Sequence, residues 1–486
     1  MPRTFALESL MHARFLLAAS TTFASLLLVS GCGSSGNGST PQDSGAPVVD
    51  SGMMMMQEGG AMDSAAPEAS VQDSGAPETG MAMTCPVSDG GFPAGYPAMH
   101  APFPVVGYGG GGILAQPEVV TITFQGDAFA PQFEQFGDQI LQTCWWDAVR
   151  QGYCDTSNNC IGRGVVPATP HVELPMPAAA SYTDQALRSF IQSEVASGAF
   201  PPPAPGTIYA MYFPGSTVIT SGAGTSCDNF DGYHEAVTVT PQGGTPTTVT
   251  YAVIDECPGG GTSLLDQTTI TASHEFTEAS TDPFASMGNY GYTIDYNDSQ
   301  NLGWEGWSIG GEVGDLCVDI LGETQGSPHD VFQATTASGS FTVQRMWSVG
   351  AAAAGGDPCL PIGPDDTPYF NLAIAPGAAT QIMTVGSQVT FEADAFSTAP
   401  LGAWNILSFD WSSYFAGTAS AISISFAGED GGVAPSAMNG DKVMVTLKLN
   451  SMPTTQIAQG VNGVVFLLVS QSGNTLHTWP GAVIAQ

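Results

Sequence analysis

The hydrophobic pattern of this chain changes character near residue 366, and that change constrains what the chain can fold into. Before it, segments that alternate like strands are interleaved with segments whose apolar residues recur at helical spacing. We expect strands at 117–125, 207–213, 235–240, 247–255 and 341–349, and helices at 131–150, 183–197 and 266–280. The first part of the folded chain is therefore predicted to be a mixed α/β arrangement.

Beyond residue 367 the sequence consists of short strand-like segments separated by turn residues, with almost no helical periodicity. The expected strands lie at 371–374, 387–394, 405–412, 420–427, 442–449 and 462–470. A Gly-, Ala- and Pro-rich stretch at 350–367 is predicted to be a linker. We therefore predict an α+β protein, with a mixed α/β domain at 85–362 and a C-terminal all-β sandwich at 366–486.

The N-terminus has the features of an export signal. Basic residues precede an apolar run at 15–29 that is too short to span a membrane comfortably. The run ends in Leu28-Val29-Ser30-Gly31-Cys32, which resembles the lipobox of bacterial lipoproteins. The resemblance implies that residues 1–31 are a signal peptide and that the thiol of Cys32 carries a lipid. It also implies a location in the bacterial cell envelope, lipid-anchored at the outer membrane or cell surface, with the membrane as a partner.

Residues 32–84 are predicted to be a disordered acidic tether. The stretch is rich in Gly, Ser, Ala, Pro and Met, and it contains acidic residues but no Lys or Arg. The hexapeptide Gln-Asp-Ser-Gly-Ala-Pro occurs in it twice, at 42–47 and 72–77. Without a periodic apolar pattern the segment cannot form a core, and its like charges repel one another.

The charge balance bears on the partners. The chain has 8 Lys and Arg residues against 44 Asp and Glu residues, a formal net charge of −36. Nucleic-acid recognition depends on clustered Lys and Arg side chains that contact phosphates. We therefore expect no nucleic-acid partner.

Cysteine usage indicates disulfides. Of the nine cysteines, lipidation of Cys32 leaves eight, and an even number in an exported protein favours pairing. No C-x-x-C pair is present, which argues against a zinc ribbon. Sequence proximity suggests Cys154–Cys160 and Cys227–Cys257. The set would be completed by Cys85–Cys144 and Cys317–Cys359.

The segment His274-Glu275-Phe276-Thr277-Glu278 lies inside the helix predicted at 266–280. On a helix His274 and Glu278 lie on the same side, one turn apart. Their spacing is that of the H-E-x-x-H zinc helix, with Glu278 in place of the second His. Histidine and glutamate are both side-chain types that bind zinc in proteins. Glu275 would then take the proton from an attacking water. A polar face of an amphipathic helix, with His274 hydrogen-bonded to a neighbour, explains the pentad alone equally well.

A second acidic cluster follows at 310–317, with the sequence Gly-Gly-Glu-Val-Gly-Asp-Leu-Cys. A turn there could present Glu312 or Asp315 to a metal held by the helix. Cys317 could fix that turn by a disulfide and so make the ligand geometry rigid. An ordinary acidic β-turn is the alternative interpretation.

Together, His-Glu-x-x-Glu followed by Asp282-Pro283, and later Glu312-Val-Gly-Asp-Leu-Cys317, resemble the motifs of the plant EXORDIUM or phosphate-induced proteins and their bacterial relatives. An aromatic-rich interval and Gly232-Tyr233-His234 fit the same resemblance, which covers roughly residues 100–360. It implies an extracellular domain of the zincin type. The tether and the C-terminal sandwich lie outside it.

The resemblance implies roles for individual residues. His274 and Glu278 would be metal ligands and Glu275 the general base. The third ligand would be Glu312 or Asp315, with Glu312 favoured. His234 is an alternative ligand, although a lone His beside a strand is more often structural.

Two weaker sets of candidates remain. The aromatic residues of the interval could line a substrate groove or pack against the motif helix; they are Tyr290, Tyr292, Tyr296, Trp304 and Trp307. The acidic turns at 228–232 and 295–298 resemble oxygen-rich Ca²⁺ sites without matching the EF-hand pattern. Calcium is therefore a second candidate cofactor beside zinc.

The sequence leads to two functional hypotheses. The first is a surface lipoprotein with a zinc-dependent hydrolase domain, a metallopeptidase acting on a peptide or a cell-surface polymer. The second is a non-enzymatic surface protein that binds glycan or matrix and whose zincin-like domain is structural or inactive. Glu278 in place of a second His favours the second hypothesis, because a carboxylate adds negative charge beside the water to be activated.

Overall fold

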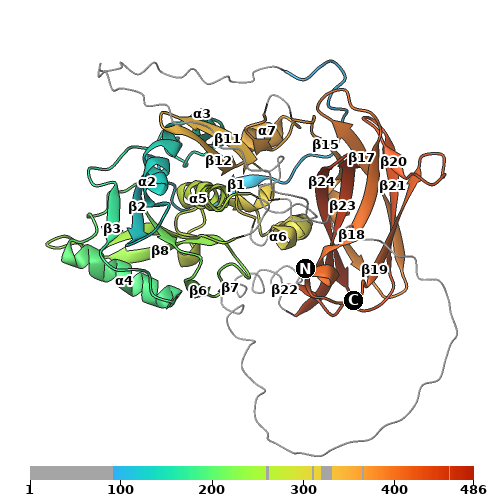
Figure 1. The fold of residues 1–486 in the computed structure, drawn as a ribbon. Coiled ribbons are helices and arrows are strands. Elements are labelled where there is room, and N and C mark those ends of the chain that lie inside the picture. The colour runs from blue at the N-terminus through green and yellow to red at the C-terminus, as the bar shows by residue number, and fades with distance from the viewer. Residues whose placement is uncertain (1–90, 259–261, 309–310, 319–330, 364–365, 459) are drawn as a thin grey trace, which may run out of the picture. The chain divides into compact units, whose positions relative to one another are not determined.

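A five-stranded sheet lies at the centre of the first part of the folded chain (Figure 1). The structure is a computed structural model, and it describes residues 91–258, 262–308, 311–318, 331–363, 366–458 and 460–486. The strand order of the sheet is β3-β2-β5-β9-β8. The strands are β2 (Glu118–Phe124), β3 (His171–Leu174), β5 (Thr207–Phe213), β8 (Gly232–Val239) and β9 (Thr247–Asp255). Four run parallel, and the edge strand β8 is antiparallel to β9. Parallel strands need crossover connections, which the intervening helices supply.

The two faces of this sheet are covered by different helices because successive side chains of a strand point to opposite sides. In β5, Tyr209 and Met211 belong to one apolar cluster, which includes α4 (Asp184–Ser197). Ile208 and Ala210 belong to the other, which includes α2 (Ala130–Gln139) and α5 (Leu264–Thr281). Burial on both faces explains why β5 reads as a continuous run of buried residues.

Helix α5 is buried nearly all round. Of its 18 residues 14 are buried, and it packs on β8, β9 and β12 (Gly339–Gln344). Many of the buried residues are Ser or Thr, which are weak helix formers because they compete for backbone hydrogen bonds. Here their hydroxyls donate to carbonyls of the preceding turn, as Thr277 does to Ser273 at 2.8 Å and Ser280 to Phe276 at 2.6 Å. Tertiary packing therefore holds a helix that propensity alone does not favour.

The predicted elements of this region are largely confirmed, with three corrections. The helix expected at 131–150 is divided into α2, a 3₁₀ turn at Ile140–Gln142 and α3 (Cys144–Val149), because the Thr143 hydroxyl caps α3 and extended backbone there interrupts the helix. The strand expected at 341–349 divides into β12 and β13 (Met346–Trp347). The expected linker contains α7 (Val349–Ala353) and β14 (Cys359–Leu360), which pairs with β13.

Three disulfides confirm predicted pairings: Cys154–Cys160, Cys227–Cys257 and Cys317–Cys359. Cys85 lies outside the described residues, so its pairing with Cys144 stays a prediction. The signal peptide at 1–31, the lipidation site Cys32 and the tether at 32–84 also lie outside them. No helix among the described residues is long and apolar enough to cross a membrane.

The C-terminal region consists of two sheets, as expected for a β-sandwich. One has the order β15-β17-β21-β19, and the other β16-β24-β23-β18-β20, with β22 added to β23. Their strands are β15 (Phe370–Ile374), β16 (Thr380–Met383), β17 (Gln388–Ser397), β18 (Trp404–Asp410), β19 (Ile422–Gly428), β20 (Ser436–Ala437), β21 (Lys442–Leu449), β22 (Gln456–Ala458), β23 (Val461–Ser472) and β24 (Thr475–Ala485). In β21 buried Val443, Val445, Leu447 and Leu449 alternate with less buried residues, as a half-buried strand requires.

The strand β24 is absent from the sequence-based expectation. It contains Pro480 and Gly481, which are unfavourable inside strands. Helix α6 (Leu302–Trp307) lies against it, and the close approach requires Gly303, because a Cβ there would come within 2.7 Å of the Gly481 backbone. Trp304 of α6 also packs on Trp479, with ring centroids 5.5 Å apart. The domain boundary near residue 362 stays a prediction.

The remaining elements are short. They are β1 (Val106–Tyr108), β4 (Ser181–Thr183), β6 (Val218–Ser221), β7 (Gly224–Thr225), η3 (Ala285–Met287), β10 (Tyr292–Ile294), η4 (Ser299–Asn301), η5 (Asp315–Cys317), β11 (Val331–Thr336), α8 (Pro376–Ala379) and α9 (Trp411–Phe415). Of these, η5 follows the turn that faces α5, and it begins with Asp315.

Replacement of Phe136 by alanine is expected to destabilise the fold by about 3 to 5 kcal/mol. Phe136 is fully buried, and its ring lies 5.9 Å from that of Phe276 on α5 and 5.2 Å from that of Phe341 on β12. Phe415→Ala is the matched control, because Phe415 is 72% exposed and its loss should cost within about 0.5 kcal/mol. Urea unfolding of both variants measures the difference, and equal midpoints would contradict the packing described for α5.

Candidate metal centre

Three separate segments bring histidine and carboxylate side chains together. Helix α5 contributes His274, Glu275 and Glu278, and the edge strand β8 contributes His234. The turn before η5 contributes Glu312, and the first residue of η5 is Asp315. The end of β12 adds Gln344 beside His274. The structure thus brings the predicted ligands and the predicted base into one cluster, together with His234, which the sequence offered only as an alternative.

The first group of facing ligand atoms consists of His274, Glu278 and Asp315. Nε2 of His274 lies 3.0 Å from Oε2 of Glu278 and 3.6 Å from Oδ1 of Asp315. The three atoms all lie within 4.8 Å of one another, which is close enough for a single metal ion. Asp315 therefore takes the place of third partner in this group. Glu312, which the sequence favoured, lies instead near His234, with 3.9 Å between its Oε1 and Nε2 of that ring.

Hydrogen bonds orient this first group. Nδ1 of His274 lies 2.9 Å from Oε1 of Gln344, whose amide nitrogen donates to the Gly314 carbonyl at 2.7 Å. The Gln344 oxygen therefore faces the imidazole, which makes Nδ1 the donor, so in the neutral ring the lone pair of Nε2 points toward the carboxylates. Oε1 of Glu278 accepts hydrogen bonds from the backbone N–H groups of Gly314 at 2.9 Å and Asp315 at 3.2 Å. Only Oε2 of Glu278 is left to face the histidines.

A glycine at position 314 is required by this close approach. A Cβ there would lie 2.8 Å from Oε1 of Glu278 and 2.8 Å from Nδ1 of His274. Two further contacts hold the turn in place. The Trp347 N–H donates to the Val313 carbonyl at 3.0 Å, and Cys317 is disulfide-bonded to Cys359. The glycine of the Glu-Val-Gly-Asp segment thus lets a rigid backbone reach the α5 carboxylate.

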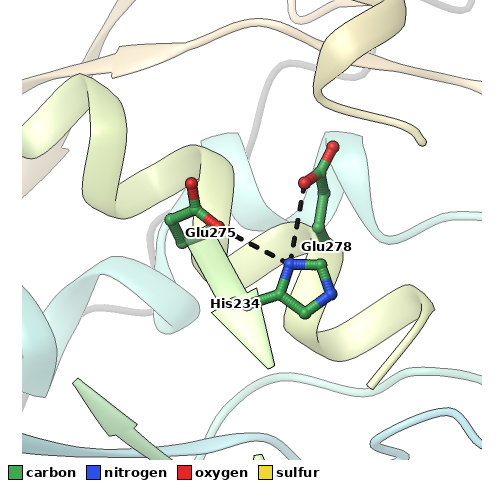
Figure 2. A group of neighbouring side chains, drawn as sticks. All are labelled: His234, Glu275 and Glu278. Atoms are coloured by element: carbon green, nitrogen blue, oxygen red, sulfur yellow. Dashed lines mark ion pairs between the residues drawn. The ribbon is translucent and has the colours of Figure 1, made fainter. Parts of the chain in front are cut away.

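The second group consists of His234, Glu275 and Glu278, shown in Figure 2. Nδ1 of His234 lies 3.5 Å from Oε2 of Glu275 and 3.8 Å from Oε2 of Glu278. Side-chain alternation in β8 turns His234 toward α5, as it does Gly232. A Cβ on Gly232 would meet Oε1 of Glu275 at 3.0 Å, so this glycine makes room for the carboxylate.

Burial is graded across the cluster. The side chains of Glu278 and Glu275 are 4% and 5% exposed, whereas those of Glu312 and Asp315 are 20% and 29% exposed. The helix side of the site is therefore closed and the turn side is open to solvent. A ligand would approach from the side of Glu312 and Asp315.

The charge of the cluster is strongly unbalanced. Within the described part of the chain, every ion pair of Glu275, Glu278, Glu312 and Asp315 is with His234 or His274, and none is with Lys or Arg. Buried carboxylates are costly unless they are paired or bind a cation. The arrangement therefore favours a divalent cation.

The pKa values of the cluster reflect this charge. Burial would lower the pKa of both histidines, but neighbouring carboxylates raise both pKa values well above the ordinary range. The largest single contribution to this rise in pKa comes from Glu312 for His234 and from Glu278 for His274. Burial would raise the pKa of Glu278, but the neighbouring charge of His274 lowers it overall. Burial raises the pKa of Glu275, against the opposing effect of His234.

The more exposed acids of the cluster are also perturbed. Burial, followed by repulsion from Glu278, raises the pKa values of Glu312 and Asp315 well above the ordinary range. Burial raises the pKa of Asp282 to about 6, although the Gly291 N–H donates to its Oδ1 at 2.7 Å. In the absence of a cation the cluster thus retains protons, which a metal would displace.

The predicted aromatic set divides in two. Tyr292, Trp304 and Trp307 are buried, and the Tyr292 hydroxyl donates to the Cys154 carbonyl at 2.7 Å, so these side chains pack in the core. Tyr290 and Tyr296 have rings 5.8 Å apart and are near enough to Asp282 and Glu312 for these acids to raise their pKa values, after burial. These two aromatics, rather than the whole interval, adjoin the cluster.

The two acidic turns have other roles in the structure. Oδ1 of Asp295 accepts from the Asn297 N–H at 2.9 Å, and Oδ1 of Asp298 accepts from the Gln300 N–H at 3.0 Å. Asp231 accepts from the Gln267 side chain at 3.1 Å. Within the described ranges, the groups of three facing ligands include none of these residues.

Several residues of the site have no clear signal in the sequence. Gln344 lies in an ordinary strand pattern, and only the structure places its amide against His274. Asp282 was part of the resemblance without an assigned role. His234 could have been given more weight from Gly232-Tyr233-His234, because a glycine two residues before a histidine on a strand lies on the same face.

No protein-family model and no curated protein matches this chain. The matching solved structures include a chimeric titin Z1Z2 functionalized with a KLER exogenous peptide from decorin, with 14% identity over 32% of this chain and 58% of that chain. Its TM-score of 0.12 carries no argument about fold.

If the first group is a zinc site, substitution of Gly314 by alanine is expected to weaken zinc binding by about 10-fold to 100-fold, the range seen when the groups that orient ligands are disturbed. The new methyl group would displace Glu278 and His274. Gly350→Ala is the matched control, because the nearest atom to a Cβ there is the Ser348 hydroxyl at 3.9 Å. Isothermal titration calorimetry with Zn²⁺ measures both affinities. Unchanged affinity in the Gly314 variant would rule out the first group as the binding site.

Proposed function

We propose that residues 85–362 form a zincin-type, zinc-dependent hydrolase domain of the metallopeptidase class. The observation that carries the proposal is the first group, in which the helix motif and the downstream turn supply three facing ligand atoms: Nε2 of His274, Oε2 of Glu278 and Oδ1 of Asp315. The α5 helix that carries the motif packs on a mixed sheet, which agrees with the resemblance.

The donor set fits zinc. Imidazole nitrogen and carboxylate oxygen are established zinc ligands, and three protein ligands leave a coordination position for water or substrate. A metal-ligating histidine usually donates its second nitrogen to a fixed acceptor, as His274 does to Gln344. Calcium prefers six or more oxygen ligands, so the imidazole favours zinc over the calcium alternative.

The chemistry follows from the position of Glu275. Zinc supplies Lewis-acid polarisation of a carbonyl and acidifies water in its coordination sphere. A carboxylate oxygen of Glu275 lies within 4.8 Å of one of Glu278, so Glu275 can take a proton from a water at the same centre. Oε2 of Glu275 has no hydrogen-bond partner among the described residues, which leaves its lone pairs available for that proton. Glu275 is therefore assigned as the general base.

The substrate class follows from the open side of the site. The partly exposed carboxylates of Glu312 and Asp315 lie on that side, and Tyr290 and Tyr296 adjoin it. A polymer with amide or other carbonyl groups, such as a peptide or a cell-surface polymer, suits an open site lined by carboxylates and aromatic rings. The sandwich at 366–486 would bind or position that polymer.

The charge of Glu278 supports a second candidate function. With a carboxylate in place of a second histidine, water at the centre is acidified less effectively. The alternative is a non-enzymatic surface protein that binds glycan or matrix and uses the metal for structure. It is distinguished by the effect of changing Glu275, which would then be without functional consequence.

The Glu275→Gln variant is expected to retain zinc at the first group and to lose peptide hydrolysis by about 100-fold or more, because the amide cannot accept the proton. Glu429→Gln, at an exposed position of the sandwich, is the matched control and should keep wild-type activity. Zinc content by mass spectrometry and cleavage of a fluorogenic peptide library measure the two effects. Zinc retention without any wild-type hydrolysis would favour the non-enzymatic alternative.

For the envelope location, the lipobox is the supporting feature, and Cys32→Ser provides its test. In a bacterial host fed a clickable fatty acid, the wild-type chain should incorporate the label and sediment with membranes. The Cys32 variant should do neither, because it lacks the acceptor thiol, whereas Ser34→Ala should behave as wild type. Label on the Cys32→Ser chain would contradict lipidation at this residue.

A further inference from the structure

His234 is built into the site in a way that the proposed function does not use. Its Nε2 lies 3.2 Å from the Asp282 backbone carbonyl, an acceptor only, so the proton of the neutral ring belongs on Nε2. Nδ1 then presents a lone pair. This lone pair faces Oε2 of Glu275 and Oε2 of Glu278, at 3.5 Å and 3.8 Å (Figure 2).

With the His234 ring neutral, as metal binding requires, three acceptor atoms converge without a donor between them. Oε2 of Glu275 makes no hydrogen bond within the described residues, although the side chain is 5% exposed. A buried carboxylate oxygen that makes no hydrogen bond and faces the lone pair of a neutral histidine is stabilised by a cation in the space between them. This observation is independent of the first group, because neither Glu275 nor His234 belongs to it.

The construction repeats that of the first group. In each case one imidazole nitrogen is directed at a fixed carbonyl-type oxygen, from Gln344 for His274 and from Asp282 for His234. The other nitrogen faces two carboxylates, one of which is Glu278 in both groups. Because backbone N–H groups occupy Oε1 of Glu278, the two groups share the single atom Oε2.

We propose that Nδ1 of His234, Oε2 of Glu275 and Oε2 of Glu278 form a second divalent-cation site that shares Glu278 with the zinc site of the proposed function. The inference rests on that function for its first cation. One imidazole and two carboxylates suit Zn²⁺. Carboxylate ligands also suit Mn²⁺, which is therefore a second candidate cation. Shared carboxylates are a known feature of two-metal hydrolytic centres.

The second site has a chemical consequence because it uses the general base. A cation bound to Oε2 of Glu275 occupies the lone pair that would otherwise take the proton from water. The first equivalent of zinc is therefore expected to activate the protein and the second to inhibit it. The second site also carries less negative charge of its own once the first cation has neutralised part of the charge on Glu278, so it binds more weakly.

The inference is tested by titrating the metal-free full-length protein with Zn²⁺. Calorimetry gives the number and affinity of the binding phases, and the metal content after gel filtration gives the stoichiometry. The wild type should bind two equivalents in separate phases. His234→Ala and Glu275→Gln should each bind one, with the affinity of the first phase preserved. His171→Ala is the matched control, since His171 also lies beside two carboxylates, Glu134 and Asp138, but outside both groups, and it should bind two.

The outcomes separate the two proposals. One equivalent in the wild type, or two in both His234→Ala and Glu275→Gln, would overturn the second site and leave the zinc hydrolase intact. No zinc binding in the folded wild type would overturn both. Circular dichroism checks that each variant is folded, and Glu275→Gln, which nearly preserves shape, decides the matter if the His234 variant does not fold. Faster hydrolysis after the second equivalent would overturn the inhibitory role.

Discussion

The structure around the site depends on one constraint: α5 buries the carboxylates of Glu275 and Glu278 where no Lys or Arg of the described chain pairs with them. The unfavourable desolvation free energy of such buried carboxylates has to be offset by hydrogen bonds, by protonation or by a cation. For Glu278, backbone N–H groups at 314–315 offset part of this free energy by donating hydrogen bonds. His234 and His274 supply the ionic partners.

The same constraint explains the packing around the helix. A helix that carries charge into the interior has to be held rigidly, and α5 is enclosed by the sheet, by β12 and by the turn before η5. Glycines at 232 and 314 let the neighbouring backbone approach the carboxylates closely. The Cys317–Cys359 disulfide ties the turn to β14, so the ligand from the turn is held from both sides. Rigid support of this kind is what keeps ligands in a productive geometry.

Much of the fold could be predicted from local pattern, because β5 and β9 are runs of apolar, β-branched and aromatic residues, and Asp282-Pro283 marks the end of α5. The break at Thr143 could not, since it depends on a hydroxyl capping α3 rather than on the apolar spacing, which continues through it. The strand β24 was missed because Pro480 and Gly481 disfavour strands locally, whereas pairing with β23 and packing against α6 outweigh that preference.

By itself the sequence determined the helix that carries His274, Glu275 and Glu278, because a spacing of four residues fixes a shared helical face whatever surrounds it. It also narrowed the third partner to Glu312 or Asp315. Only the tertiary structure decided that Asp315 faces His274, that His234 joins the cluster from an antiparallel edge strand, and that Gln344 orients the imidazole. The contact between Gln344 and His274 joins residues 70 positions apart, and local periodicity holds no information on pairs so distant.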